Sequence, residues 1–179
     1  MNGIASSLDP VASVSVESLW QVLEHECGLV GVKITPFPHF TWQVADGYDL
    51  PRLEIMLHGL ARQTRPFTVR SAGLGLFTGE SPIVYIPLVK DEYLLRFHAK
   101  LWKLTDGIAS TPHPYYAPDK WVPHITLAYG DVSAQNLDCV MQALAFRSFE
   151  WEIRVDNLAF MAQPDDGPTT SCHYRFGKP

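Results

Sequence analysis

The spacing of apolar residues along the chain predicts helices that alternate with strand hairpins. Four segments repeat apolar residues at helical spacing and are expected to be amphipathic helices: residues 17–28, 52–63, 91–104 and 133–145, the last capped by Ser133. Runs that alternate or are apolar throughout are expected to be strands: residues 11–16, 67–77, 83–89, 122–129, 149–155, 158–161 and 171–176.

The segments between these elements are predicted to be irregular. Residues 1–10 are expected to form a loose N-terminal arm, residues 78–82 and 164–168 turns, and residues 105–120 a loop rich in Pro and Tyr. Helices that alternate with hairpins favour an α+β fold over a doubly wound parallel sheet. A length of 179 residues suits one domain, 1–179, or two small lobes that share a core.

The motif Pro-His-x-Thr occurs twice, with its histidine at His39 and again at His124. Side chains of an extended strand point alternately to its two faces, so His39 and Thr41 share one face, as do His124 and Thr126. The apolar residue within each motif then faces the core. Each copy therefore predicts an imidazole and a hydroxyl side by side on an open face.

Composition limits the classes of function. A net charge of −5 argues against a protein that grips long nucleic acid by neutralising phosphates. Cys27, Cys139 and Cys172 are odd in number and form no Cys-x-x-Cys pair, which predicts packed, reduced thiols rather than disulfides or a zinc ribbon. The N-terminus lacks a secretory pattern, and no apolar run approaches the roughly 20 residues of a membrane span. We expect a cytoplasmic protein without a membrane segment.

Two imidazoles facing one phosphate are suited to in-line displacement at phosphorus. One removes a proton from the attacking oxygen while the other gives a proton to the leaving oxygen, and both forms of His exist near neutral pH. A neighbouring Thr hydroxyl can donate to a non-bridging phosphate oxygen. Two histidines alone make a poor zinc site, and the chain lacks nucleotide-loop and metalloprotease motifs, so no metal ion and no cofactor are expected. The alternative, two structural strand histidines, explains neither the repetition nor the paired threonines.

The two motifs, Pro38-His39-Phe40-Thr41 and Pro123-His124-Ile125-Thr126-Leu127-Ala128, resemble those of the two-histidine (2H) phosphoesterase superfamily, which includes RNA 2′-5′ ligase-like proteins and cyclic nucleotide phosphodiesterases. Residues 67–104 are similar to the middle section of that family. The resemblance implies a bilobal, LigT-like α+β fold, with two pseudo-symmetric lobes of antiparallel strands and outer helices around a central cleft. It also implies His39 and His124 as acid and base, and Thr41 and Thr126 as phosphate-binding residues.

The resemblance implies a metal-independent phosphodiesterase that opens the 2′,3′-cyclic phosphate of a nucleotide or RNA end to a 2′-phosphate. Alternatives are ligation of 2′-5′ RNA, hydrolysis of another cyclic phosphodiester such as a cyclic ADP-ribose phosphate, or a non-catalytic nucleotide- or RNA-binding module. The intact His and Thr in both copies count against the last. The expected partner is a nucleotide or short RNA, and the expected oligomeric state is a monomer.

Aromatic residues near the motifs are candidates for stacking on a base, although core packing is the favoured role because aromatic side chains commonly fill cores. These candidates are Trp42, Tyr85, Tyr115, Tyr116, Trp121 and Tyr129. Tyr129 stands where many relatives carry a basic residue. His25, His58 and His98 lie in predicted helices: His25 is expected to be exposed beside a solvated Glu, and His58 and His98 are expected to be structural.

Overall fold

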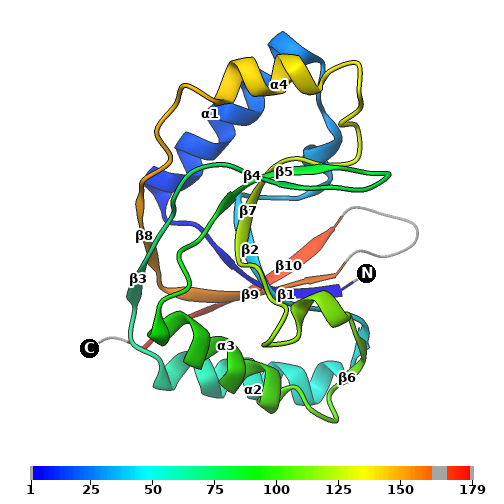
Figure 1. Cartoon of the computed structure of the whole chain (residues 1–179). Helices are drawn as coiled ribbons and strands as arrows, with labels where there is room; N and C mark the ends of the chain where they lie inside the picture. The colour runs from blue at the N-terminus through cyan, green and yellow to red at the C-terminus, as the bar shows by residue number, and fades with distance from the viewer. Residues whose placement is uncertain (1, 163–168, 178–179) are drawn as a thin grey trace.

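The fold is built around one antiparallel sheet that is shared by two lobes. The computed structural model describes residues 2–162 and 169–177, and within them eight strands form the sheet in the order β10-β9-β1-β2-β7-β5-β4, with β6 beside β2 (Figure 1). These strands are β1 (Asn2–Ser7), β2 (His39–Tyr48), β4 (Gly75–Phe77), β5 (Ile83–Pro87), β6 (Ala109–Pro112), β7 (His124–Ala128), β9 (Asn157–Ala162) and β10 (Thr170–Arg175). A separate pair joins β3 (Phe67–Arg70) to β8 (Glu152–Val155).

Two helices cover each half of the sheet. Helix α1 (Pro10–Cys27) packs on β7 and on α4 (Leu137–Leu144). Helix α2 (Leu50–Gln63) packs on β9 and β10, and α3 (Glu92–Leu104) packs on β2. The two helix pairs therefore lie at opposite ends of the molecule, with β2 and β7 between them (Figure 1). The α+β fold with two lobes is confirmed. Of the described helices, none has both the length and the apolar character needed to span a bilayer.

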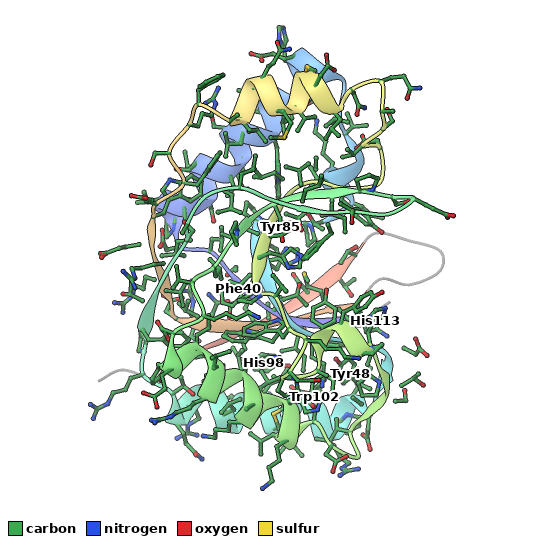
Figure 2. The ribbon with its side chains drawn as sticks, in the orientation of Figure 1. Phe40, Tyr48, Tyr85, His98, Trp102 and His113 are labelled. Carbon is green, nitrogen blue, oxygen red and sulfur yellow. A yellow bond between two sulfur atoms is a disulfide. The ribbon has the colours of Figure 1, made fainter. Side chains whose placement is uncertain are left out.

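The two lobes meet where β2 touches β7, at the single bridge between Phe40 and Ile125. Both side chains are buried, and Figure 2 shows Phe40 in the centre of the molecule. Behind them the Trp42 ring packs on Trp121, and the His98 ring stacks on Trp121 with centroids 3.8 Å apart. His98 donates from Nε2 to the Trp42 carbonyl at 3.0 Å, and burial lowers its pKa to about 4. His98 is therefore a neutral core residue, as expected.

The expectation for the N-terminus is wrong. Residues 2–7 form β1, an inner strand between β2 and β9, because Ile4 and Ala5 are fully buried and pair on both sides. The small residues around Ile4 left little apolar pattern to recognise. Residues 11–16 are also helical rather than extended: Asp9 caps α1 by accepting from two backbone N–H groups, and Pro10 takes the first helical position.

Other predicted boundaries need smaller corrections. The expected strand 67–77 is split into β3 and β4, which belong to different sheets, with Gly73 in a left-handed conformation between them. Helix α4 begins at Leu137 instead of Ser133, and the expected loop 105–120 contains β6 and a 3-10 turn at Pro114–Tyr116. Helices α2 and α3 and the strands β5, β7, β8, β9 and β10 lie where they were expected, within a few residues. The predicted turn 164–168 lies outside the described residues.

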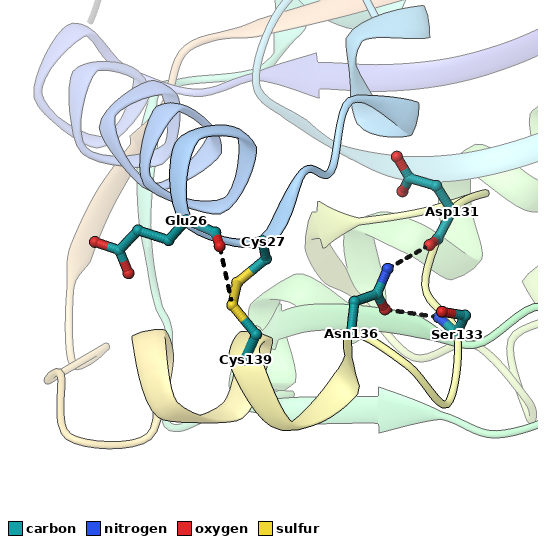
Figure 3. The surroundings of a disulfide bond; sticks show 6 residues. All are labelled: Glu26, Cys27, Asp131, Ser133, Asn136 and Cys139. Atoms are coloured by element: carbon teal, nitrogen blue, oxygen red, sulfur yellow. Dashed lines mark hydrogen bonds between the residues drawn. A yellow bond between two sulfur atoms is a disulfide. The ribbon is translucent and has the colours of Figure 1, made fainter.

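The expectation of reduced thiols is wrong for two of the three cysteines. Cys27 at the end of α1 and Cys139 in α4 form a disulfide across a sequence separation of 112 residues (Figure 3). Cys172 is free and exposed. The packing of α1 on α4 brings the two Cα atoms to 5.8 Å, a proximity that spacing along the chain could not reveal. The cysteine count therefore gives no support for a reducing compartment.

Removing this disulfide is expected to destabilise the protein by about 2–4 kcal/mol, because the cross-link restricts a long loop of the unfolded chain. The double variant Cys27→Ser/Cys139→Ser should show this loss in its free energy of denaturant unfolding. Cys172→Ser is the matched control and should change that free energy by less than about 0.5 kcal/mol, since Cys172 is exposed. Equal stability of the double variant and the wild type would contradict the cross-link.

Candidate active site

The two motifs lie at the starts of two touching strands. β2 begins at His39 and β7 at His124, and the bridge between the two strands is antiparallel. Continuing that register by one residue places His39 opposite Thr126 and Thr41 opposite His124, on the face away from the buried bridge. The two histidines are then diagonal neighbours, which typically lie about 7–8 Å apart, with their Cβ atoms somewhat closer. This spacing leaves room for one phosphate between them.

All four side chains line one cleft of about 340 Å³. Each of them is half-buried, in contrast to the fully buried residues that alternate with them along β2 and β7. The alternation expected for both motif strands is therefore confirmed. The rest of the lining comes from Asn2, Gly3, Val32, Ile34, Thr35, Pro36, Val44, Ile83, Tyr116, Tyr129, Met161 and Thr169.

The chain fixes the tautomer of both histidines in the same way. His39 Nδ1 lies 2.9 Å from the Phe37 carbonyl oxygen, and His124 Nδ1 lies 2.7 Å from the Val122 carbonyl oxygen. A carbonyl only accepts hydrogen bonds, so the neutral ring must carry its hydrogen on Nδ1 and donate it. Each Nε2 is left with a free lone pair and is the atom that can take up or release a proton.

The main chain at each of the two threonines is fixed by a hydrogen bond from a tryptophan side chain. The main-chain carbonyl of Thr41 accepts from Trp121 Nε1 at 2.9 Å, and that of Thr126 accepts from Trp20 Nε1 at 3.1 Å. Neither hydroxyl makes a hydrogen bond within the described part of the chain. Each hydroxyl is therefore available to donate to a bound group.

The electrostatics of the cleft favour neutral histidines. Burial lowers the pKa of His39, the hydrogen bond to Phe37 opposes this effect, and the nearby His124 lowers the pKa further. Burial also lowers the pKa of His124, and the hydrogen bond to Val122 opposes it. The lowered pKa values favour the neutral form of both rings, which can accept a proton. A bound anion would favour the charged form of one of them.

Two aromatic rings pack on His124 and position it. The Phe77 ring meets it edge-on at 5.0 Å and the Tyr85 ring at 5.2 Å. Gly75 makes this possible, because a Cβ there would collide with the Tyr85 ring. Sequence reasoning missed Phe77 and also Phe37, whose ring packs edge-on against His39 at 5.8 Å. The only available signal was an aromatic residue two positions before His39.

The aromatic candidates divide into three groups. Trp42 and Trp121 are 0% and 1% exposed and fill the junction between the lobes, which is the core-packing role that was favoured for them, so neither ring is free to stack on a base. Tyr116 and Tyr129 line the cleft, and Tyr85 packs on His124 beside it. Tyr115 is 73% exposed and lies outside the lining.

The described residues offer no ready metal site. Across residues 2–162 and 169–177, no group of three or more His, Cys, Asp or Glu side chains is placed to share one ion. Among the described residues, the lining of the cleft consists of two imidazoles and otherwise neutral groups. Its own chemistry is therefore proton transfer and hydrogen-bond donation.

Comparisons with known proteins indicate the family to which the chain belongs. Residues 10–167 match the model of the 2′-5′ RNA ligase superfamily. A Bacillus cereus (strain B4264) protein named "Putative phosphoesterase" is 26% identical over 146 residues, covering 79% of this chain and 80% of its own. A Bacillus anthracis (strain CDC 684) protein of the same name matches equally.

Solved structures share the fold at low sequence identity. TT0787 of Thermus thermophilus superposes with a TM-score of 0.66 at 19% identity, covering 98% of this chain and 97% of its own. Escherichia coli LigT complexed with 3′-AMP superposes with a TM-score of 0.61 at 16% identity, with the same coverage. These similarities establish the LigT-like fold.

Proposed function

Because the chain belongs to the 2′-5′ RNA ligase superfamily of two-histidine phosphoesterases, we propose that it hydrolyses a 2′,3′-cyclic phosphate on a nucleotide or RNA end, without a metal ion. The observation that carries this proposal is the doubled arrangement of the cleft. Two imidazoles with free Nε2 atoms and two free hydroxyls line one small cleft. They come from the antiparallel strands β2 and β7.

The proposed reaction is an in-line displacement by water. The neutral imidazole takes a proton at Nε2 from the attacking water, whose oxygen forms a bond to phosphorus. The bond from phosphorus to the ribose 3′ oxygen breaks, and the protonated imidazole on the opposite side gives its Nε2 proton to that oxygen. The products are a 2′-phosphate and a free 3′-hydroxyl. The pair ends with its protons exchanged and returns to its starting state through solvent.

The threonines are proposed to stabilise the charge that develops on phosphate. Hydroxyls of Thr41 and Thr126 would donate to the two non-bridging oxygens, which carry more negative charge in the transition state than in the substrate. Fixed donors on β2 and β7 need no reorganisation during the reaction. Thr41 and Thr126 lie one on each strand, so each non-bridging oxygen has its own donor.

Nucleotide binding by a structural relative supports the choice of substrate. The solved LigT structures include complexes with 3′-AMP and with NADP⁺, so that fold accepts nucleotides. Ligation of 2′-5′ RNA would use the same residues in reverse, but it brings two RNA strands to a chain with a net charge of −5. Hydrolysis is therefore the reaction that we propose.

Turnover of a nucleoside 2′,3′-cyclic monophosphate by purified protein in excess EDTA tests this proposal. We expect steady turnover that the chelator leaves unchanged. Chromatography beside standards of the nucleoside 2′-phosphate and 3′-phosphate should identify the product as the 2′-phosphate. Loss of turnover in EDTA that one divalent ion restores would show that a metal takes part. Tight binding of the nucleotide without any turnover would favour the binding-module alternative.

A further inference from the structure

One side of the cleft is a short segment that lies between α1 and β2. This wall segment, residues 30–36, contains a 3-10 helix at Gly31–Ile34. Four of its side chains line the cleft: Val32, Ile34, Thr35 and Pro36. None of the four titrates near neutral pH, so they supply binding surface for a substrate and take no part in proton transfer.

The chain on both sides of the wall segment is fixed independently of the segment itself. On one side the disulfide joins Cys27 to Cys139. On the other side the N–H of Leu8 donates to the Pro38 carbonyl at 3.1 Å, and His39 is the first residue of β2 and pairs with β1. The position of His39 is therefore set by β1 and does not depend on the wall segment.

The wall segment is held at its beginning by one carboxylate from the far side of the cleft. Asp131, three residues after the end of β7, accepts at Oδ2 from the N–H groups of Val30 at 2.6 Å and Gly31 at 2.7 Å. Asn136 fixes this loop in turn, because its Nδ2 donates to the Asp131 main-chain carbonyl at 2.9 Å (Figure 3). Hydrogen bonds to an ionised acceptor are roughly twice as strong as neutral ones. Asp131 therefore ties the wall segment to the end of β7.

The other polar contacts of the wall segment are weaker. Lys33 forms an ion pair with Glu24 of α1, but both side chains are exposed, and such pairs contribute little. Thr169 donates to the Ile34 carbonyl at 3.3 Å, which is long for a hydroxyl donor. Asp131 Oδ1 is buried and has no hydrogen-bond partner in the described part of the chain, a cost to stability that is typical of functional sites.

The close approach of the wall segment to the end of β7 requires a glycine at position 31. A Cβ on Gly31 would lie 2.1 Å from the main-chain oxygen of Tyr129 and 2.9 Å from Asp131 Oδ1, so a larger residue would push the wall segment away. Tyr129 itself lines the cleft. The width of the cleft is thus set where Gly31 meets Tyr129 and Asp131.

Resting on the function proposed above, we propose that Asp131 is a positioning residue for substrate binding, because its two hydrogen bonds hold the wall segment against the end of β7. Without this tie the wall segment leaves its place in a fraction of the molecules, and the apparent affinity for substrate falls by that fraction. His39 and His124 keep their positions, since their strands and carbonyl partners are unchanged. The expected effect is therefore on KM and not on kcat.

Asp131→Ala tests this inference with adenosine 2′,3′-cyclic monophosphate as substrate. We expect KM to rise about tenfold, while kcat and its pH profile stay within about twofold of the wild type. The dissociation constant of adenosine 2′-monophosphate, measured by calorimetry, should rise in parallel with KM. Asp138→Ala is the matched control: it removes an exposed acidic residue of α4 and should change none of these values.

Two further variants separate positioning from a general loss of stability. Asp131→Asn keeps an oxygen that can accept from both N–H groups, so its KM should return to within about threefold of the wild type. Gly31→Ala displaces the wall segment by inserting a methyl group, and it should raise KM with kcat unchanged, as Asp131→Ala does. In the double variant the two effects should not add, because a displaced wall segment already accommodates the methyl group.

An unchanged KM in Asp131→Ala, with the fold intact by circular dichroism, overturns the inference. A fall in kcat that accounts for the whole loss of kcat/KM also overturns it, because Asp131 would then act on the histidines. If Asp131→Ala does not fold, Gly31→Ala decides the question by the same division between KM and kcat. Absence of turnover by the wild type overturns the proposed function instead, and the calorimetric affinities for adenosine 2′-monophosphate still test the role of Asp131.

Discussion

Replacing His39 or His124 by alanine lowers kcat for the cyclic nucleotide by about 100- to 10,000-fold, the range expected for loss of a general acid or base. Each of these histidines lines the cleft and keeps its Nε2 free while Nδ1 donates to a carbonyl, and no other described His lines the cleft to take its place. The two losses should not add in the double variant, because acid and base act in the same step. Single-turnover kinetics on all three variants measure these effects.

The control for these variants is His58→Ala, which removes an exposed histidine on α2 and should leave kcat unchanged. Added imidazole should restore part of the rate in either cleft variant, because it can occupy the space of the missing ring. A loss of less than about threefold in either variant, with the fold intact by circular dichroism, would contradict its role in proton transfer.

Replacing Thr41 or Thr126 by valine is the second large effect, a slowing of kcat by roughly 10 to 1,000-fold. Valine keeps the branched shape of threonine on the strand and removes only the hydroxyl, so the loss reports the donor to the phosphate oxygen. Thr→Ser at the same positions keeps the hydroxyl and should retain most of the rate. Steady-state kinetics should show the loss mainly in kcat, since the interaction strengthens in the transition state.

If the valine variants match the wild type in kcat, the side chains of both threonines serve only in packing. A rise in KM with kcat unchanged would instead show that the hydroxyls bind substrate and transition state equally. The backbone anchoring of the two threonines by Trp20 and Trp121 does not involve the hydroxyls, so it remains in all four variants.

The sequence allowed the placement of the four motif side chains to be predicted because the motif is local. His39 and Thr41 need only an extended backbone to share a face, and the same holds for His124 and Thr126. The structure places all four on one cleft, as the repetition indicated. Amphipathic helices such as α3 were also predictable, because their apolar residues follow helical spacing.

The remaining features depend on contacts between distant segments. β1 is an inner strand because β2 and β9 flank it, and nothing within Asn2–Ser7 shows this. Trp42 and Trp121 lie close enough to the motifs in sequence to be candidates for stacking, yet both rings are buried where the lobes meet. The disulfide needs α1 to pack on α4, which is a property of the fold and not of cysteine spacing.

The pH dependence of kcat/KM for the cyclic mononucleotide tests the central claim, that one neutral and one protonated histidine act on the same phosphate. Burial lowers the pKa of both His39 and His124 in the free protein, so the mixed state is most populated below the usual His value of about 6.5. The rate should fall at higher pH, where the protonated ring loses its proton and both rings are neutral. It should also fall at lower pH, where both rings are charged.

We therefore expect a bell-shaped profile of kcat/KM with its optimum below about pH 6.5, whose two limits belong to the pair. The profile of kcat should lie at higher pH, because the bound anion favours the imidazolium. Single-turnover rates across about pH 5 to 9 make the chemical step visible. A bell in those rates that disappears in His39→Ala and His124→Ala is the predicted result, and a flat wild-type profile across that range would contradict the two-histidine mechanism.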